Sequence, residues 1–227
     1  VCTMIDAFGM QLKKSESKAV AVDAFLDTVG NWAHDCIDAF GGAPILESHD
    51  QLTYLTALEA YLKARSDRDV MDFLNTERDR VKRYFEQSGQ WFHGYWCEQE
   101  VHHGTEHFEI FLQSLWRLQG ADEATIEQID DVAEHLGNWV DGIPQWYDWE
   151  TNLFHSMYLG TKSVKINESV KLNVPDHLRC IGLAVFAYKA TGKERYLRLA
   201  RLSSERWVEA LLNDGRVPLA LEPGGVV

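Results

Sequence analysis

The fold is decided most clearly by residues 176–202, DHLRCIGLAVFAYKATGKERYLRLARL. Apolar residues recur at three- and four-residue steps through 176–190 and again through 193–212, and Gly192 stands between the two runs. This spacing is typical of amphipathic helices, and a glycine commonly follows the last turn of a helix. The stretch therefore predicts a helical hairpin: a long apolar helix, a tight turn, and a second helix with more charge.

The same pattern occurs at two earlier places in the chain. Residues 50–70 align with residues 176–196, and residues 105–120 align with residues 177–192, which brings Gly120 onto Gly192. Hairpin units are thus expected to begin near residues 50, 105 and 176. A repeated hairpin cannot bury its apolar face alone, so we expect neighbouring units to stack.

Helical periodicity covers most of the remaining chain. We expect further helices at 22–40, which Gly41 and Gly42 end, at 52–62 behind a capping box at 48–51, at 67–85, at 105–118, at 121–140 and, as a short helix, at 152–159. Residues 163–174 are expected to form a short hairpin or a loop, and no strong strand is expected elsewhere. The predicted fold class is all-α, with repeated helical hairpins forming an (α/α)n toroid or a segment of one. A plain α-solenoid is the alternative.

Length suggests that this toroid is incomplete. Toroids of about six or seven hairpins, at about 55 residues each, need well over about 300 residues, and this chain has 227. We therefore expect residues 1–227 to be a single α/α-toroid domain that is a fragment of a larger catalytic domain. A secreted or periplasmic location is expected if the parent chain carries a signal peptide, and the oligomeric state is not predicted.

Composition excludes several classes of function. Lys and Arg number 22 against 35 Asp and Glu, a formal net charge of −13, which disfavours binding to nucleic acid and to anionic membranes. No apolar run is long enough to span a bilayer. The four cysteines lie far apart, so isolated thiols are expected rather than a zinc ribbon or a disulfide framework. No P-loop, G-x-G-x-x-G or G-x-S-x-G motif occurs, so we expect neither a nucleotide cofactor nor serine-hydrolase chemistry.

Histidine and glutamate are concentrated in residues 91–108, WFHGYWCEQEVHHGTEHF. In a continuous helix, i, i+4 spacing would bring His102 beside Glu106 and His103 beside His107, so that both pairs could converge on one ion. Gly104 makes such a continuous helix doubtful. Imidazole and carboxylate ligands together suit Mn or Zn better than Mg or Ca. The expected ligands of a divalent transition metal are His102, His103, Glu106, His107 and, from the next short helix, His155. A metal-free catalytic or sugar-contacting cluster and a set of structural histidines stay open as alternatives.

Two further segments contain candidate binding residues. Residues 137–155 alternate tryptophan and tyrosine with carboxylates, a combination that suits sugar rings and their hydroxyl groups. The alternative is that these aromatic residues only pack the loop against the helices. Residues 175–180 place Asp176 as a helix N-cap, with His177 and Arg179 in the first turn, where an inner helix would direct them to a cleft.

Residues 145–152, QWYDWETN, resemble the N-W-W-x-x-E-I-G-x-P stretch that lines the cleft of several families of α/α-toroid polysaccharide lyases. Trp146 and Glu150 match that stretch, whereas Gln145 replaces its first asparagine and the I-G-x-P end is absent. The His/Glu cluster is similar in kind to that of the metal-dependent toroidal pectate lyases. The resemblance covers roughly residues 90–200 and identifies no single family.

This resemblance implies β-elimination in a uronate-containing polysaccharide, with an acidic polysaccharide or oligosaccharide as substrate. A base removes the proton α to the C6 carboxylate, a cation or metal stabilises the enolate, and an acid assists the leaving glycosidic oxygen. The catalytic residues implied are Tyr147, Tyr95, His103 and Arg179, the last to hold the substrate carboxylate. The substrate-binding residues implied are Trp96, Trp146, Trp149, Asn152 and His177. The acidic net charge weighs against this interpretation.

Two other classes of function stay open. An α/α-toroid glycoside hydrolase would use two carboxylates, Asp148 or Glu150 with Glu98 or Glu106, at a separation set by its stereochemistry. A non-enzymatic α-solenoid would use the aromatic residues as a protein-binding face. The concentration of histidine and glutamate favours an enzyme.

Overall fold

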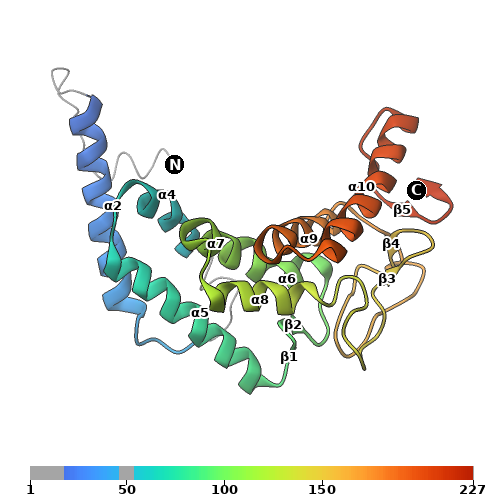
Figure 1. Ribbon diagram of the computed structural model, residues 1–227, viewed down its shortest axis with the longest axis horizontal. Helices are drawn as coiled ribbons and strands as arrows, with labels where there is room; N and C mark the ends of the chain where they lie inside the picture. The colour runs from blue at the N-terminus through green and yellow to red at the C-terminus, as the bar shows by residue number, and fades with distance from the viewer. Residues whose placement is uncertain (1–17, 46–53, 227) are drawn as a thin grey trace.

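The computed structural model describes residues 18–45 and 54–226, and its chain is mostly helical (Figure 1). This confirms the all-α class. The helices are α2 (Lys18–Phe40), the 3₁₀ helix η1 (Tyr54–Ala57), α4 (Leu58–Ala64), α5 (Arg68–Ser88), α6 (Val101–Glu106), the π-helix η2 (His107–Leu112), α7 (Gln113–Gln119), α8 (Glu123–Ala133), α9 (His177–Thr191) and α10 (Glu194–Asp214). The capping box expected at 48–51 lies outside the described residues.

The expected hairpins are present as α4–α5, α6–η2–α7 with α8, and α9–α10. Each turn has a local cause. The side chain of Asp67 accepts a hydrogen bond from the Val70 N–H and caps α5, and Asp122 caps α8 in the same way through the Thr125 N–H. Gly192 ends α9 in the left-handed conformation, at φ 71°, which costs little without a Cβ.

Neighbouring hairpins stack through their first helices. Helix α4 contacts α7, α6 contacts α9, and α8 packs against α9 from the next unit along the chain. In Figure 1 these helices follow one another across the molecule, with α2 at one end and the C-terminal half of α10 at the other. Helices of neighbouring units are therefore in contact, as the stacking expected from the sequence requires.

Helix α6 begins earlier than the sequence predicts and continues through Gly104. A Cβ at Gly104 would lie 1.9 Å from the phenol oxygen of Tyr95, so only glycine lets the buried tyrosine approach the helix this closely. The glycine that makes a helix doubtful by propensity is thus required by packing. The following turn is a π-helix, and α7 completes the segment.

Two helical expectations are wrong in extent or in kind. Helix α8 ends at Ala133, well before residue 140. Residues 134–138 form a turn, in which Asn138 has a left-handed backbone (φ 63°). Buried residues such as Leu136 continue the apolar spacing through this turn, which explains why the sequence predicts a longer helix. Residues 152–159 are extended rather than helical: β4 (Leu153–Phe154) pairs with β3 (Tyr147–Asp148), and the turn between them passes through Asn152 at φ 58°.

Within the described residues, three hairpins of two-residue strands supplement the helices. Besides β3–β4, strand β1 (Trp91–Phe92) pairs with β2 (Tyr95–Trp96), and β5 (Leu221–Glu222) pairs with β6 (Gly225–Val226). Residues 163–174 form mainly a loop, with one bridge between Leu159 and Val164 and another between Asn173 and Leu221. Strands this short show no periodicity in a sequence.

In the part of the chain that the structure describes, the buried apolar residues form two clusters. One gathers residues of α6, α8, α9, α10 and the β3–β4 hairpin, and the other gathers residues of α2, α4, α5 and α7. Trp91 and Trp96 of the β1–β2 hairpin pack against both clusters. The N-terminal and C-terminal hairpins thus share a continuous packed interior, against which α6 is held.

Candidate functional site

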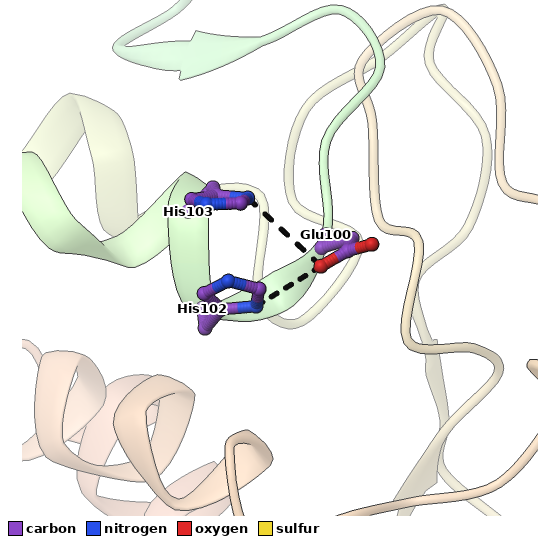
Figure 2. A group of neighbouring side chains, drawn as sticks. All are labelled: Glu100, His102 and His103. Carbon is purple, nitrogen blue, oxygen red and sulfur yellow. Dashed lines mark ion pairs between the residues drawn. The ribbon is translucent and has the colours of Figure 1, made fainter. Parts of the chain in front are cut away.

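The candidate site lies at the start of α6, where two histidines approach one carboxylate. Glu100 Oε2 lies 3.2 Å from His102 Nδ1 and 3.9 Å from His103 Nδ1. Figure 2 shows both imidazoles directed from the first turn of the helix toward Glu100. The side chains of Glu100, His102 and His103 are 29 %, 30 % and 45 % exposed, so the group is open to a ligand and only partly solvated.

Local backbone geometry explains this convergence. Glu100 is the N-cap residue of α6, with an extended backbone (φ −68°, ψ 151°), so its side chain lies beside the first helical turn. His103 follows at i+3, a neighbouring position on a helix surface. His102 packs its ring against that of His103, at a centroid distance of 3.8 Å. Three side chains within four consecutive positions thereby form one cluster.

A distant segment supplies a tyrosine to the cluster. Residues 157–159 run antiparallel to residues 99–101, through hydrogen bonds from the Val101 N–H to the Met157 carbonyl (2.7 Å) and from the Leu159 N–H to the Gln99 carbonyl (3.1 Å). The Tyr158 hydroxyl donates a hydrogen bond to Glu100 Oε1. This hydrogen bond raises the pKa of Tyr158, so its phenol stays protonated at neutral pH.

Positive charge lies on two sides of the cluster. Lys165 Nζ is 4.8 Å from the centroid of the Tyr158 ring, a cation–π contact. Arg179, in the first turn of α9, donates to the His102 carbonyl at 3.4 Å. Arg179 Nη1 also lies 3.1 Å from Glu109 Oε2 and 3.9 Å from Glu106 Oε1, so protein carboxylates already surround this guanidinium.

The cluster fits a divalent metal by its donor chemistry. Among the described residues, the group of three or more ligating side chains that could hold one ion is Glu100, His102 and His103, whose ligand atoms all lie within 4.8 Å of one another. Two imidazoles and one carboxylate match Zn or Mn and would leave a coordination position for substrate. Bond lengths of about 2.0–2.2 Å require these side chains to close in on the ion.

Three of the expected metal ligands lie elsewhere. His107 is 5 % exposed, its ring contacts those of Phe85, Trp91 and Phe111, and its buried Nδ1 has no hydrogen-bond partner. Burial lowers the pKa of His107 to about 4. Glu106, on the next turn of α6, faces Arg179 of α9. His155 lines a separate pocket at the β3–β4 hairpin. The structure brings only His102 and His103 of the expected set together, and it adds Glu100.

The two expected catalytic tyrosines are interior residues. Tyr95 is fully buried over Gly104, and Tyr147 is buried with its hydroxyl accepting a hydrogen bond from Ser203 Oγ at 2.9 Å. Burial raises the pKa of both phenols. Neither reaches the surface at the cluster, where Tyr158 lies instead. Predicting Tyr158 from the sequence would have required knowing that residues 157–159 pair with residues 99–101. This pairing is a single bridge and leaves no pattern in the sequence.

The expected substrate-binding residues divide between interior and surface. Trp146 is fully buried, donates through Nε1 to the Gly160 carbonyl at 3.1 Å and stacks on His135. His177 is also buried, with Nε2 2.9 Å from the Ser156 carbonyl. Both therefore present no face to a ligand.

The other three expected substrate-binding residues are partly exposed. Trp96 packs its ring against Trp91, Trp149 packs against Trp139 and Tyr147, and Asn152 occupies the β3–β4 turn. Of the expected platforms, Trp96 and Trp149 thus keep some accessible surface.

Comparison of the chain with family models, with curated proteins and with solved structures finds no match in any of the three. Among the residues that the structure describes, no helix combines the length and the apolar character needed to cross a membrane.

Proposed function

We propose that this chain is part of an α/α-toroid polysaccharide lyase that cleaves a uronate-containing polysaccharide by β-elimination. The observation that carries the proposal is the convergence of two imidazoles and a protonated phenol on the carboxylate of Glu100. The toroid is supported by the stacked hairpins, whose first helices contact one another in sequence order from α4 to α9. A closed ring would require further units of this kind to continue the stack.

β-Elimination needs a positive charge near the substrate carboxylate, a base for the proton α to it, and an acid for the leaving oxygen. A divalent transition metal held by Glu100 and His102, whose ligand atoms lie 3.2 Å apart, would supply the charge. A chain with net charge −13 needs such a cation to attract an acidic polymer.

Proton transfer is assigned to the residues around Glu100. Tyr158 is the acid, because its hydrogen bond to Glu100 keeps the phenol protonated until the glycosidic oxygen departs. His103 is the more exposed of the two imidazoles and lies farther from Glu100, and it is assigned as the base that takes the α-proton. Lys165, whose ammonium group lies against the Tyr158 ring, is assigned as a contact for the carboxylate of an incoming uronate.

The test is to incubate the chain with pectate, alginate and glucuronan and to follow the ultraviolet absorbance of the unsaturated uronate. Tyr158→Phe and Glu100→Gln are expected to lower the rate by roughly 10²-fold or more, the range of a general acid. Tyr188→Phe on α9 and Glu98→Gln on the exposed loop are the matched controls and should retain the rate. New reducing ends without ultraviolet absorbance would indicate hydrolysis and contradict the lyase proposal. The absence of any cleavage would contradict the proposal that the chain is an enzyme.

Metal binding is tested separately by calorimetric titration with Zn²⁺ and with Mn²⁺. Glu100→Gln should weaken binding by roughly 10-fold or more, since it removes the charged ligand, and Glu98→Gln should leave the affinity unchanged. Equal affinities in the two variants, or no transition metal bound by the unmodified chain, would contradict the assigned ligands.

A further inference from the structure

A second polar pocket lies at the C-terminal end of the molecule, away from the residues assigned to the lyase. Its volume is about 250 Å³, and its walls come from the β3–β4 hairpin, the loop before α9 and the β5–β6 turn. These segments lie together near the C-terminus in Figure 1. The polar and charged residues lining it are Asp148, Thr151, His155, Lys171 and Glu222, and Pro223 closes one edge.

Asn173 holds the walls of this pocket in place. Its side chain accepts a hydrogen bond from the Phe154 N–H at 2.9 Å and donates to the Phe154 carbonyl at 2.6 Å. Its backbone pairs with Leu221 through two hydrogen bonds of 2.9 and 2.7 Å. Asn173 is buried, and it therefore fixes β4 and β5 on either side of the cavity before any ligand binds.

The pocket offers hydrogen-bond acceptors in defined positions. Asp148 Oδ1 accepts from the Glu150 N–H at 2.8 Å, and Oδ2 accepts from Thr151 Oγ1 at 2.7 Å. The Thr151 N–H adds a third hydrogen bond to this carboxylate. Since a carboxylate oxygen accepts about two hydrogen bonds, Asp148 keeps capacity for about one more. Glu222 contributes a second carboxylate from the opposite turn.

The pocket is also lined by two side chains that can donate hydrogen bonds, one charged and one an imidazole. Lys171 provides an ammonium group, and His155 provides an imidazole. Lys171 Nζ pairs with Glu168 Oε2 at 2.9 Å, but the Glu168 side chain is 91 % exposed, and such surface pairs are weak enough to be exchanged for a ligand. A ligand in this cavity thus meets charges of both signs.

Mixed charge and small size together define the ligand. An anion would face two carboxylates and a cation would face the lysine, and like charges brought together in a binding site are costly. A neutral molecule rich in hydroxyl groups can donate to the carboxylates and accept from Lys171 and His155. The cavity is smaller than the roughly 300–1,000 Å³ of pockets for drug-sized ligands, which limits the ligand to about one ring.

We propose that this pocket binds a single neutral monosaccharide unit, with Asp148 and Glu222 accepting from its hydroxyl groups and Lys171 and His155 donating to them. The site is separate from the Glu100 cluster. Its occupant is uncharged, whereas the substrate of the proposed lyase is a uronate. The pocket therefore serves to hold a neutral sugar of a mixed polysaccharide, and this role does not depend on the lyase activity.

The test is a titration of the chain with glucose, galactose, mannose and xylose, each followed through the imidazole ring signals in the NMR spectrum. The His155 signal is assigned by its loss in His155→Gln. At least one neutral sugar should shift this signal and leave the His103 signal in place, with a dissociation constant on the order of 1 mM, as few contacts and one ring allow. Glucuronate and glucosamine should bind at least about fivefold more weakly.

Glu222→Gln and Lys171→Met should each weaken sugar binding by about fivefold or more, while Glu205→Gln on the exposed face of α10 should not. Thermal melting of all variants verifies that they are folded. No shift of His155 with any neutral sugar, equal binding in Glu222→Gln and the unmodified chain, or tighter binding of glucuronate or glucosamine would each overturn the proposal.

Discussion

His107 offers a prediction that separates a core residue from a metal ligand. Its imidazole packs among Phe85, Trp91 and Phe111, with a buried Nδ1 that has no hydrogen-bond partner. Burial holds its pKa at about 4, against an ordinary value of 6.5. Since the charged form is disfavoured in the folded state, the unfolded chain binds more protons between these two pH values, and folding is destabilised as pH falls below 6.5.

The magnitude follows from this shift. One pKa unit corresponds to about 1.36 kcal/mol, so lowering the pH from 7.5 to 4.5 should cost the unmodified chain about 2.5 kcal/mol through His107 alone. His107→Leu removes this loss and also removes a buried polar atom without a partner. We expect the variant to be at least as stable at pH 7.5 and about 2.5 kcal/mol more stable, relative to the unmodified chain, at pH 4.5.

The assay is urea unfolding of both proteins at the two pH values, with His34→Gln as a control for an exposed histidine. The buried His135 also has a pKa lowered to about 4, but it is present in both proteins and cancels in the difference. Calorimetry should show unchanged Zn²⁺ affinity in His107→Leu. A stability difference independent of pH would refute the burial argument, and lost metal affinity would return His107 to the ligand set.

Three further predictions concern stability. Gly160→Ala should destabilise the fold by at least about 1–3 kcal/mol, because the new Cβ would lie 2.1 Å from the Cys97 carbonyl oxygen. Gly182→Ala in α9, whose Cβ would have no atom within 4 Å, should stabilise the fold by about 0.5–1 kcal/mol, and urea unfolding of the two variants checks both signs. Asn173→Ala should cost about 1–3 kcal/mol, since it leaves the Phe154 backbone groups unpaired, and an unchanged melting temperature would contradict its bridging role. Hydrogen bonds from Arg117 lower the pKa of Glu59 to about 2, so its stabilising effect should persist above pH 4.5 and disappear as pH falls toward 2; acid titration of Glu59→Gln should lack that loss.

The helical hairpins could be predicted because their signals are local. Apolar spacing along α9 and α10 and the glycine between them depend only on neighbours in the sequence. The same spacing failed beyond Ala133, because Leu136 is buried in a turn and keeps the helical pattern without a helix. The two-residue strands gave no pattern at all, so the extended course of residues 153–159 could not be foreseen.

The site was predictable only in part, for a related reason. His102 and His103 were predicted from the concentration of histidine and glutamate in residues 91–108. Their partner Tyr158 could not be predicted, because it reaches the cluster through a single bridge from a distant segment. Spacing alone cannot show what covers a helix face, and α5 and the β1–β2 hairpin cover His107. Aromatic residues gave a similar ambiguity, since Trp146 and Tyr147 fill the core rather than line a surface.

The proposed function depends on Glu100, whose carboxylate brings His102, His103 and Tyr158 together in a metal-assisted β-elimination site. The most direct test is the ultraviolet absorbance of unsaturated uronate, released from pectate, alginate or glucuronan by the unmodified chain and by Glu100→Gln, each with and without added Zn²⁺ or Mn²⁺. Absorbance is expected to grow with metal for the unmodified chain and to fall by about 10²-fold in Glu100→Gln. Equal rates in the two proteins, or no absorbance from any polyuronate, would contradict the proposed function.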